Sequence, residues 1–87
     1  MLIRSQNKKS LVNMDNIDTI NCYSTGIDFE LIAYNVNTEI CLGSYSTEYK
    51  AIKVLDMIEK KYLLLNSSLS GVGSNGVFQM PEDKDVY

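Results

Sequence analysis

The residues that define the architecture are "IDFELIAYNVNTEICLGSYST", positions 27–47. Apolar residues dominate two runs, 27–36 and 39–45, and polar, Asn-rich residues at 35–38 join them. Two such runs around a short turn predict a β-hairpin. Gly43 lies inside the second run, where a glycine indicates a bulge or the close approach of another part of the chain.

A long amphipathic helix is predicted after the hairpin. Ser46 and Thr47 are both good N-cap residues, and Glu48 places a carboxylate at the positive end of the helix dipole. We expect the helix to continue to about Leu64, because apolar residues recur at three- and four-residue spacing. Lysines and Asp56 fill most of the opposite side, so the helix has one face for a sheet. The apolar residues are Ala51, Ile52, Val54, Leu55, Ile58, Tyr62 and Leu65.

Shorter strands are predicted on either side of this unit. Before the hairpin, turn residues separate apolar segments at 2–5, 10–14 and 17–24. Gly26 follows them and can adopt a positive φ in the turn that enters the hairpin. After the helix, residues 77–80 form a last apolar strand.

This order of elements predicts the α+β class, with a single domain over residues 1–81. We expect an antiparallel, meandering β-sheet of about five to six short strands, one long amphipathic helix packed on it, and a C-terminal strand. Pro81 cannot donate to a strand ladder, so it ends that last strand. Residues 82–87 are charged, and we expect them to form a frayed tail.

The composition argues against several classes of protein. The net charge is -3 and the pI is about 4.7, whereas nucleic-acid-binding domains are usually basic. No apolar run approaches the ~20 residues of a membrane span, and the segment Met1 to Arg4 lacks the apolar region of a signal peptide. We therefore expect a cytoplasmic protein with no membrane contact, and nucleic acid is not an expected partner.

Catalytic and metal-binding chemistry is poorly represented. The chain has no histidine, the usual general base near neutral pH, and it has neither a nucleophile elbow nor a Walker loop. Cys22 and Cys41 do not form a CxxC pair, so we expect free, buried thiols rather than a zinc site or a disulfide. We predict that the protein is not an enzyme and uses no cofactor or metal.

The candidate ligand-binding residues come from both ends of the chain and from the hairpin. Arg4 is the only arginine, and its guanidinium can bind phosphate or carboxylate through two hydrogen bonds; it can equally be a surface residue paired with a carboxylate. The Gly-rich stretch 70–76 is a phosphate cradle, a lid over a ligand or a flexible connector. Its place after a helix and before a strand favours the connector over the phosphate cradle. The ligand-binding hypothesis names Arg4, Gln6, Tyr34, Tyr45, Ser74 and Asn75.

The number of tyrosines indicates a possible protein interface. Six tyrosines exceed what a small core holds comfortably; tyrosines are enriched in interfaces, although they also lie at core margins. The strand 27–36 is apolar on both faces, since Ile32, Tyr34 and Val36 share the face opposite Phe29. This face predicts a contact with another subunit, and hence a homo-oligomer.

Four groups of short segments occur in order along nearly the whole chain. They are Ile3-Arg4-Ser5-Gln6 followed by Leu11, Leu42-Gly43-Ser44-Tyr45-Ser46-Thr47-Glu48, Ala51 with Val54-Leu55-Asp56-Met57-Ile58, and Val77-Phe78-Gln79-Met80-Pro81. Through these segments and their order, the chain resembles small proteins encoded by phages, prophages and mobile elements of low-GC Gram-positive bacteria. The resemblance implies a genomic setting and a location in the host cell, and it transfers no catalytic residue.

Three functional hypotheses follow from these observations. The first is a non-enzymatic phage or mobile-element protein that counters bacterial anti-phage defence, either by binding a host defence protein or by sequestering a small nucleotide signal. The second is a structural or accessory phage protein that acts through self-association. The third is a nucleic-acid-binding regulator, which the acidic balance disfavours.

Overall fold

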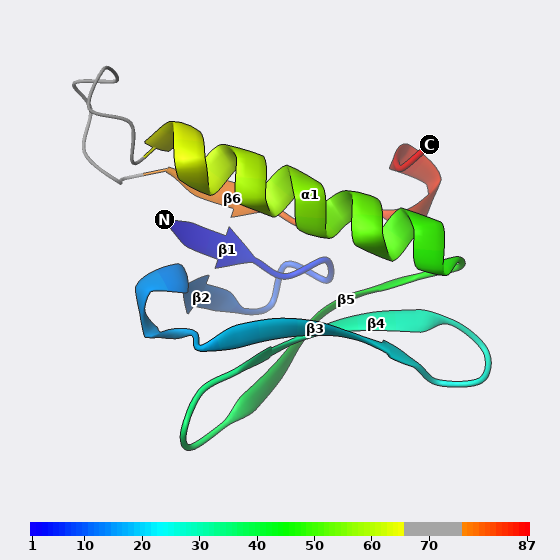
Figure 1. The fold of residues 1–87 in the computed structure, drawn as a ribbon, viewed down its shortest axis with the longest axis horizontal. Helices are drawn as coiled ribbons and strands as arrows, with labels where there is room; N and C mark the ends of the chain where they lie inside the picture. Colours follow the sequence, from blue (N-terminus) through cyan, green and yellow to red (C-terminus); the bar gives the residue numbers. More distant parts are fainter. Residues whose placement is uncertain (66–75) are drawn as a thin grey trace.

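The computed structural model describes residues 1–65 and 76–87 and confirms the α+β class (Figure 1). One long helix accompanies six short strands within these residues. The elements are β1 Leu2–Arg4, β2 Leu11–Asn13, the 3₁₀ turn η1 Met14–Asn16, β3 Thr19–Ser24, β4 Phe29–Tyr34, β5 Glu39–Tyr45, α1 Glu48–Leu65, β6 Val77–Gln79 and the 3₁₀ turn η2 Asp83–Asp85.

The strands form two three-stranded sheets rather than one meander. Sheet B has the order β3-β4-β5 and is antiparallel throughout, as predicted for the hairpin and the strand before it. Sheet A has the order β2-β1-β6, and β6 pairs with β1 in parallel, with Phe78 opposite Ile3. A purely antiparallel meander was therefore the wrong expectation for the last strand. Because β6 follows a long helical connection instead of a tight turn, it can run parallel to its neighbour.

Gly43 has both of the roles that its position in the strand predicted. Leu31 lies opposite Gly43 whereas Ile32 lies opposite Cys41, so one extra residue makes a bulge in β5. A Cβ atom on Gly43 would lie 3.1 Å from the Cβ atom of Gln6. The bulge therefore brings β5 against the turn that follows β1.

Helix α1 begins where its sequence predicts, but Ile52 of the expected stripe is 45% exposed because it lies beside the buried face and not on it. The Thr47 hydroxyl accepts a hydrogen bond from the Lys50 amide at 3.1 Å, which identifies Thr47 as the N-cap. The buried face of α1 consists of Ala51, Val54 and Ile58, and the helix packs across all three strands of sheet B. In Figure 1, β6 and β1 lie beside the same helix.

A single apolar core joins both sheets and the helix. Each strand of sheet A and each of the last two strands of sheet B contributes at least one buried side chain. The core residues are Met1, Ile3, Val12, Leu31, Ala33, Leu42, Tyr45, Ala51, Val54, Ile58, Phe78, Met80 and Val86.

The segment 82–87, which was expected to fray, instead packs against the N-terminus of α1. Val86 is only 4% exposed, and the Asp83 carboxylate accepts hydrogen bonds from the amide and hydroxyl of Ser46 at 2.8 and 3.0 Å. The Ser46 amide, its hydroxyl and the nearby Lys50 ammonium lower the pKa of Asp83. Since this pKa lies below the unfolded value, the contact stabilises the fold at neutral pH and is lost as the pH falls through the lowered pKa.

Candidate functional site

The predicted ligand-binding residues do not converge on one site. Arg4 is exposed on β1, and its Nε and Nη2 atoms both donate to the Lys8 carbonyl at 3.2 Å. Tyr34 lies in β4 of the other sheet. Ser74 and Asn75 lie outside the described residues. Among the described candidates, the guanidinium and the Tyr34 ring therefore belong to separate surfaces.

Gln6 and Tyr45 do come together, at the carbonyl oxygen of Pro81. The Tyr45 hydroxyl donates to this oxygen at 2.7 Å and Gln6 Nε2 donates to it at 3.1 Å. Gln6 also donates to the Ser44 carbonyl and accepts from the Ser44 amide, both at 3.0 Å. Tyr45 is 1% exposed, and burial raises the pKa of its hydroxyl, which therefore stays a donor. These two side chains fasten the C-terminal segment to sheet B.

The second face of sheet B is exposed, as the subunit-contact hypothesis requires. Tyr23 and Tyr34 lie there with ring centroids 6.2 Å apart. A hydrogen bond with Tyr23 and partial desolvation raise the pKa of Tyr34 to about 12. Ile32 in β4 is half-buried, and Val36 in the following turn is 89% exposed. The face is thus partly apolar, and its role as a subunit contact stays a prediction.

The two cysteines are free, as predicted, but they are not both buried. Cys22 is half-buried, whereas Cys41 is exposed because it points to the outer face of sheet B. Partial burial raises the pKa of both thiols, and the carboxylates Glu48 and Glu30 add to the effect at Cys22 and Cys41 respectively. A thiol with a raised pKa is a poor nucleophile at neutral pH.

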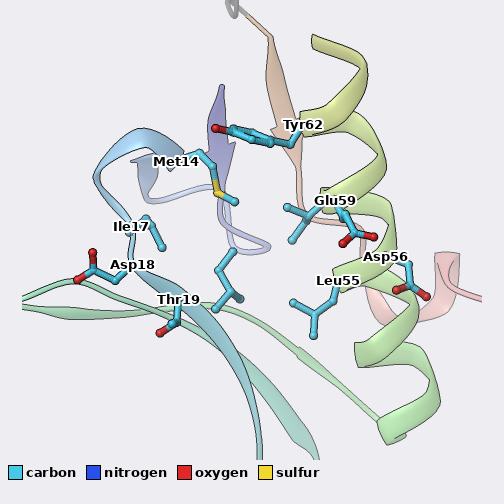
Figure 2. A pocket seen from close by; sticks show the side chains of 10 residues that line it. Met14, Ile17, Asp18, Thr19, Leu55, Asp56, Glu59 and Tyr62 are labelled. Carbon is cyan, nitrogen blue, oxygen red and sulfur yellow. The ribbon is translucent and has the colours of Figure 1, made fainter. Parts of the chain in front are cut away.

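A pocket of about 350 Å³ lies between α1 and the segment that enters β3 (Figure 2). We call it the α1–β3 pocket. Figure 2 shows the side chains of Met14, Ile17 and Leu55 extending into the space between the two segments. The volume is at the lower end of the range of small ligand sites, about 300–1,000 Å³. The lining residues are Met14, Ile17, Asp18, Thr19, Ile20, Leu55, Asp56, Ile58, Glu59 and Tyr62.

The charged residues of the α1–β3 pocket are all acidic. Asp18 lies on the β3 side, and Asp56 and Glu59 lie on the α1 side; all three are exposed. The ion pairs among the described residues are Lys50–Asp83 and Lys84–Glu82, so neither neutralises the pocket. Asp56 and Glu59 lie three residues apart on α1, and Lys53 and Lys60 lie at helical spacing from Asp56 outside the pocket lining.

Interpretation of the sequence missed this pocket, although a local signal was present. Each pocket carboxylate directly follows an apolar residue that also lines the pocket: Ile17-Asp18, Leu55-Asp56 and Ile58-Glu59. In each dipeptide the apolar side chain is buried or half-buried at the floor of the pocket, and the carboxylate is exposed at its margin. The pairing of the two segments across space was not visible in the sequence, because it depends on how α1 crosses β3.

Neither a cluster of metal-ligating side chains nor a membrane-spanning helix is found among the described residues. No group of three or more possible metal-ligating side chains occurs in residues 1–65 and 76–87. Within the same ranges, α1 is too polar to cross a membrane.

No family model, curated protein or solved structure matches this chain. The resemblance to phage and mobile-element proteins therefore stays a prediction from the sequence segments.

Proposed function

We propose that this protein is a non-enzymatic binding protein of a phage or mobile element, and that it counters anti-phage defence by binding a host defence protein. The observation that carries this proposal is the α1–β3 pocket, which combines an apolar floor with an acidic margin. The setting in a phage or mobile element rests on the resemblance of the sequence segments. Cytoplasmic action follows from that setting.

A protein partner fits the pocket better than a nucleotide signal does. Phosphate groups carry negative charge, and Asp18, Asp56 and Glu59 would repel them. Arg4, the residue best suited to bind phosphate, lies in sheet A and already donates to a backbone carbonyl. We therefore favour the host-protein form of the hypothesis over the sequestration of a nucleotide.

The side-chain chemistry supports a role without catalysis. Histidine is absent from the whole chain. Both thiols have a raised pKa, so neither is activated for nucleophilic attack. The acidic side chains at the pocket lie beside aliphatic side chains. This combination is suited to binding a ligand.

The proposal predicts that the protein restores phage infection in a defended host. The chain would be expressed in a panel of low-GC Gram-positive strains, each carrying one anti-phage defence system, and the efficiency of plating measured. We expect plating to rise by orders of magnitude on the strain that carries the target. A chain with the core substitution Leu31→Asp is the unfolded control and should leave plating unchanged.

A thermal-shift screen against nucleotides separates the two forms of the proposal. Cyclic dinucleotides, cyclic oligonucleotides and ADP-ribose derivatives should leave the melting temperature unchanged. A ligand present at a hundred times its Kd would add about 2.7 kcal/mol, which shifts the melting temperature of a small domain by many degrees. Such a shift would replace the host-protein form by sequestration, whereas unchanged plating on every strain would refute the anti-defence role.

The outer face of sheet B favours one second candidate, a structural phage protein that acts through self-association. Tyr23, Ile32 and Tyr34 give this face the aromatic and aliphatic character of an interface. Sedimentation of the wild-type chain and of Ile32→Glu would test it. A stable oligomer that Ile32→Glu dissociates, together with unchanged plating, would favour this candidate over the first.

A further inference from the structure

We infer that the α1–β3 pocket binds a segment of the partner in which one large apolar side chain is flanked by lysine or arginine. The inference rests on the proposed function for the existence of a protein partner. It adds the chemistry of the segment that is recognised, which the proposed function leaves open.

The floor of the pocket accounts for the apolar side chain. Met14, Ile17, Ile20 and Leu55 are each half-buried, so apolar surface stays in contact with solvent in the free protein. Covering that surface with an aliphatic or aromatic side chain is favourable in proportion to the area removed from water. Met14 has an unbranched side chain that can adapt to different shapes. The pocket is thus suited to one large apolar group without demanding a single residue type.

The margin of the pocket accounts for the basic flanks. Asp18, Asp56 and Glu59 are exposed residues that line the pocket, and no lysine or arginine is among the lining residues. The Asp18 carboxylate points away from α1, so its charge lies at the outer side of the pocket (Figure 2). A cationic segment would be attracted to Asp18 on one side and to Asp56 and Glu59 on the other. An acidic or phosphorylated segment would be repelled by the same groups.

The adjacent strand accounts for the choice of a protein segment over a small amine. Strand β3 pairs with β4 on one side, and among the described strands nothing pairs with its other edge. Thr19 and Ile20, which begin this strand, and Asp18 just before it also line the pocket. An edge strand offers backbone donors and acceptors to an extended peptide, so a segment that enters the pocket can form main-chain hydrogen bonds beside it.

Peptide titration monitored by NMR tests the inference. The probe is the synthetic peptide acetyl-Lys-Arg-Leu-Arg-Lys-amide, added to the ¹⁵N-labelled chain at low ionic strength. We expect the largest amide shifts at residues 17–20 and 55–62. Replacing the central leucine with glycine should reduce the shifts by removing the apolar group, and replacing the four basic residues with glutamate should abolish them.

Two matched double variants separate the pocket from general electrostatics. Asp56→Asn with Glu59→Gln removes two charges at the pocket, and Glu39→Gln with Glu82→Gln removes two exposed charges elsewhere. The first variant should weaken peptide binding about five- to tenfold, consistent with the loss of two solvent-exposed ion pairs, and should change the melting temperature little, since both positions are exposed. The second variant should bind nearly as the wild type does.

Two results would overturn the inference. One is that the acidic peptide binds as tightly as the basic peptide. The other is that the amide shifts map to a different surface, or stay unchanged in the Asp56→Asn, Glu59→Gln variant. Failure here and failure of the proposed function are distinguishable. If plating is restored but the peptides ignore the pocket, the inference alone is wrong. If the peptides bind as expected but plating never changes, the site stands and the anti-defence role is wrong.

Discussion

Replacing Leu31 with alanine should lower the free energy of unfolding by about 2–5 kcal/mol, because the change leaves a cavity in a filled core. Leu31 is 0% exposed and lies in β4, the central strand of sheet B. Its side chain belongs to the same core as Leu42 and Val54, which come from β5 and α1. A chain of this length has a total stability of about 4–13 kcal/mol, so the variant loses a large share of it.

Urea denaturation followed by circular dichroism measures this effect. The control is Ile32→Ala, which removes a similar volume from the next residue along the same strand. Ile32 points to the outer face and is only half-buried, so we expect a loss of about 1 kcal/mol. Equal losses for the two variants would mean that the outer face of sheet B is as well covered in solution as the core. That result would favour the self-associating form of the protein.

Replacing Gln6 with alanine should lower the free energy of unfolding by about 2–4 kcal/mol, although this residue is polar and lies in a turn. Its amide makes hydrogen bonds with the Ser44 amide, the Ser44 carbonyl and the Pro81 carbonyl. All of these bonds are partly buried, so the freed groups are not fully rehydrated. The Gln6 backbone amide also donates to the Leu42 carbonyl at 2.7 Å, which alanine retains.

Arg4→Ala is the matched comparison, since both residues were candidates for ligand binding. The Arg4 side chain is exposed and donates to the Lys8 carbonyl in the adjacent turn, so its loss should cost within about 0.5 kcal/mol. Amide hydrogen exchange at Ser44 should accelerate in Gln6→Ala and stay unchanged in Arg4→Ala. If Gln6→Ala has wild-type stability and a wild-type exchange rate at the Ser44 amide, the hydrogen bonds of Gln6 to Ser44 and Pro81 are not retained in solution.

The elements that could be predicted from the sequence depend on local interactions. The β4–β5 hairpin follows from two apolar runs around an Asn-rich turn, and the helix start follows from Thr47 and the apolar repeat after it. Gly26 has the positive φ, 91°, that its turn predicted. Each of these features is determined by residues within a few positions of one another, so the pattern of side chains is sufficient.

The features that escaped prediction depend on contacts between distant residues. The parallel pairing of β6 with β1 joins the two ends of the described chain. The packing of the 82–87 segment depends on Asp83 reaching Ser46, which the charge of the segment alone does not indicate. The charge of Asp83 indicated a solvated side chain, but its hydrogen-bond partner, Ser46, lies more than thirty positions away in the sequence.

The candidate site was missed for a related physical reason. Gln6 and Tyr45 attract attention in a sequence because they can bind ligands, yet here both bind the Pro81 carbonyl. The side chains around the pocket are ordinary aliphatic and acidic residues, whose types indicate nothing unusual. What distinguishes them is their arrangement around an opening, and that arrangement exists only after α1 has crossed β3.

The parallel pair of β1 and β6 has a consequence for the order of assembly. Sheet B and α1 come from one continuous run of chain, and their strand pairs close short loops. Pairing Ile3 with Phe78 instead closes a loop of about 75 residues, which costs about 1.5 kcal/mol more in chain entropy than closing one of about 12 residues. The β1–β6 pair should therefore form late, on a framework that is already in place, and pulse-labelled amide exchange would show protection at Leu31 before Met80, whose amide donates to the Arg4 carbonyl. Protection at both residues in the same phase would mean that the two sheets form together.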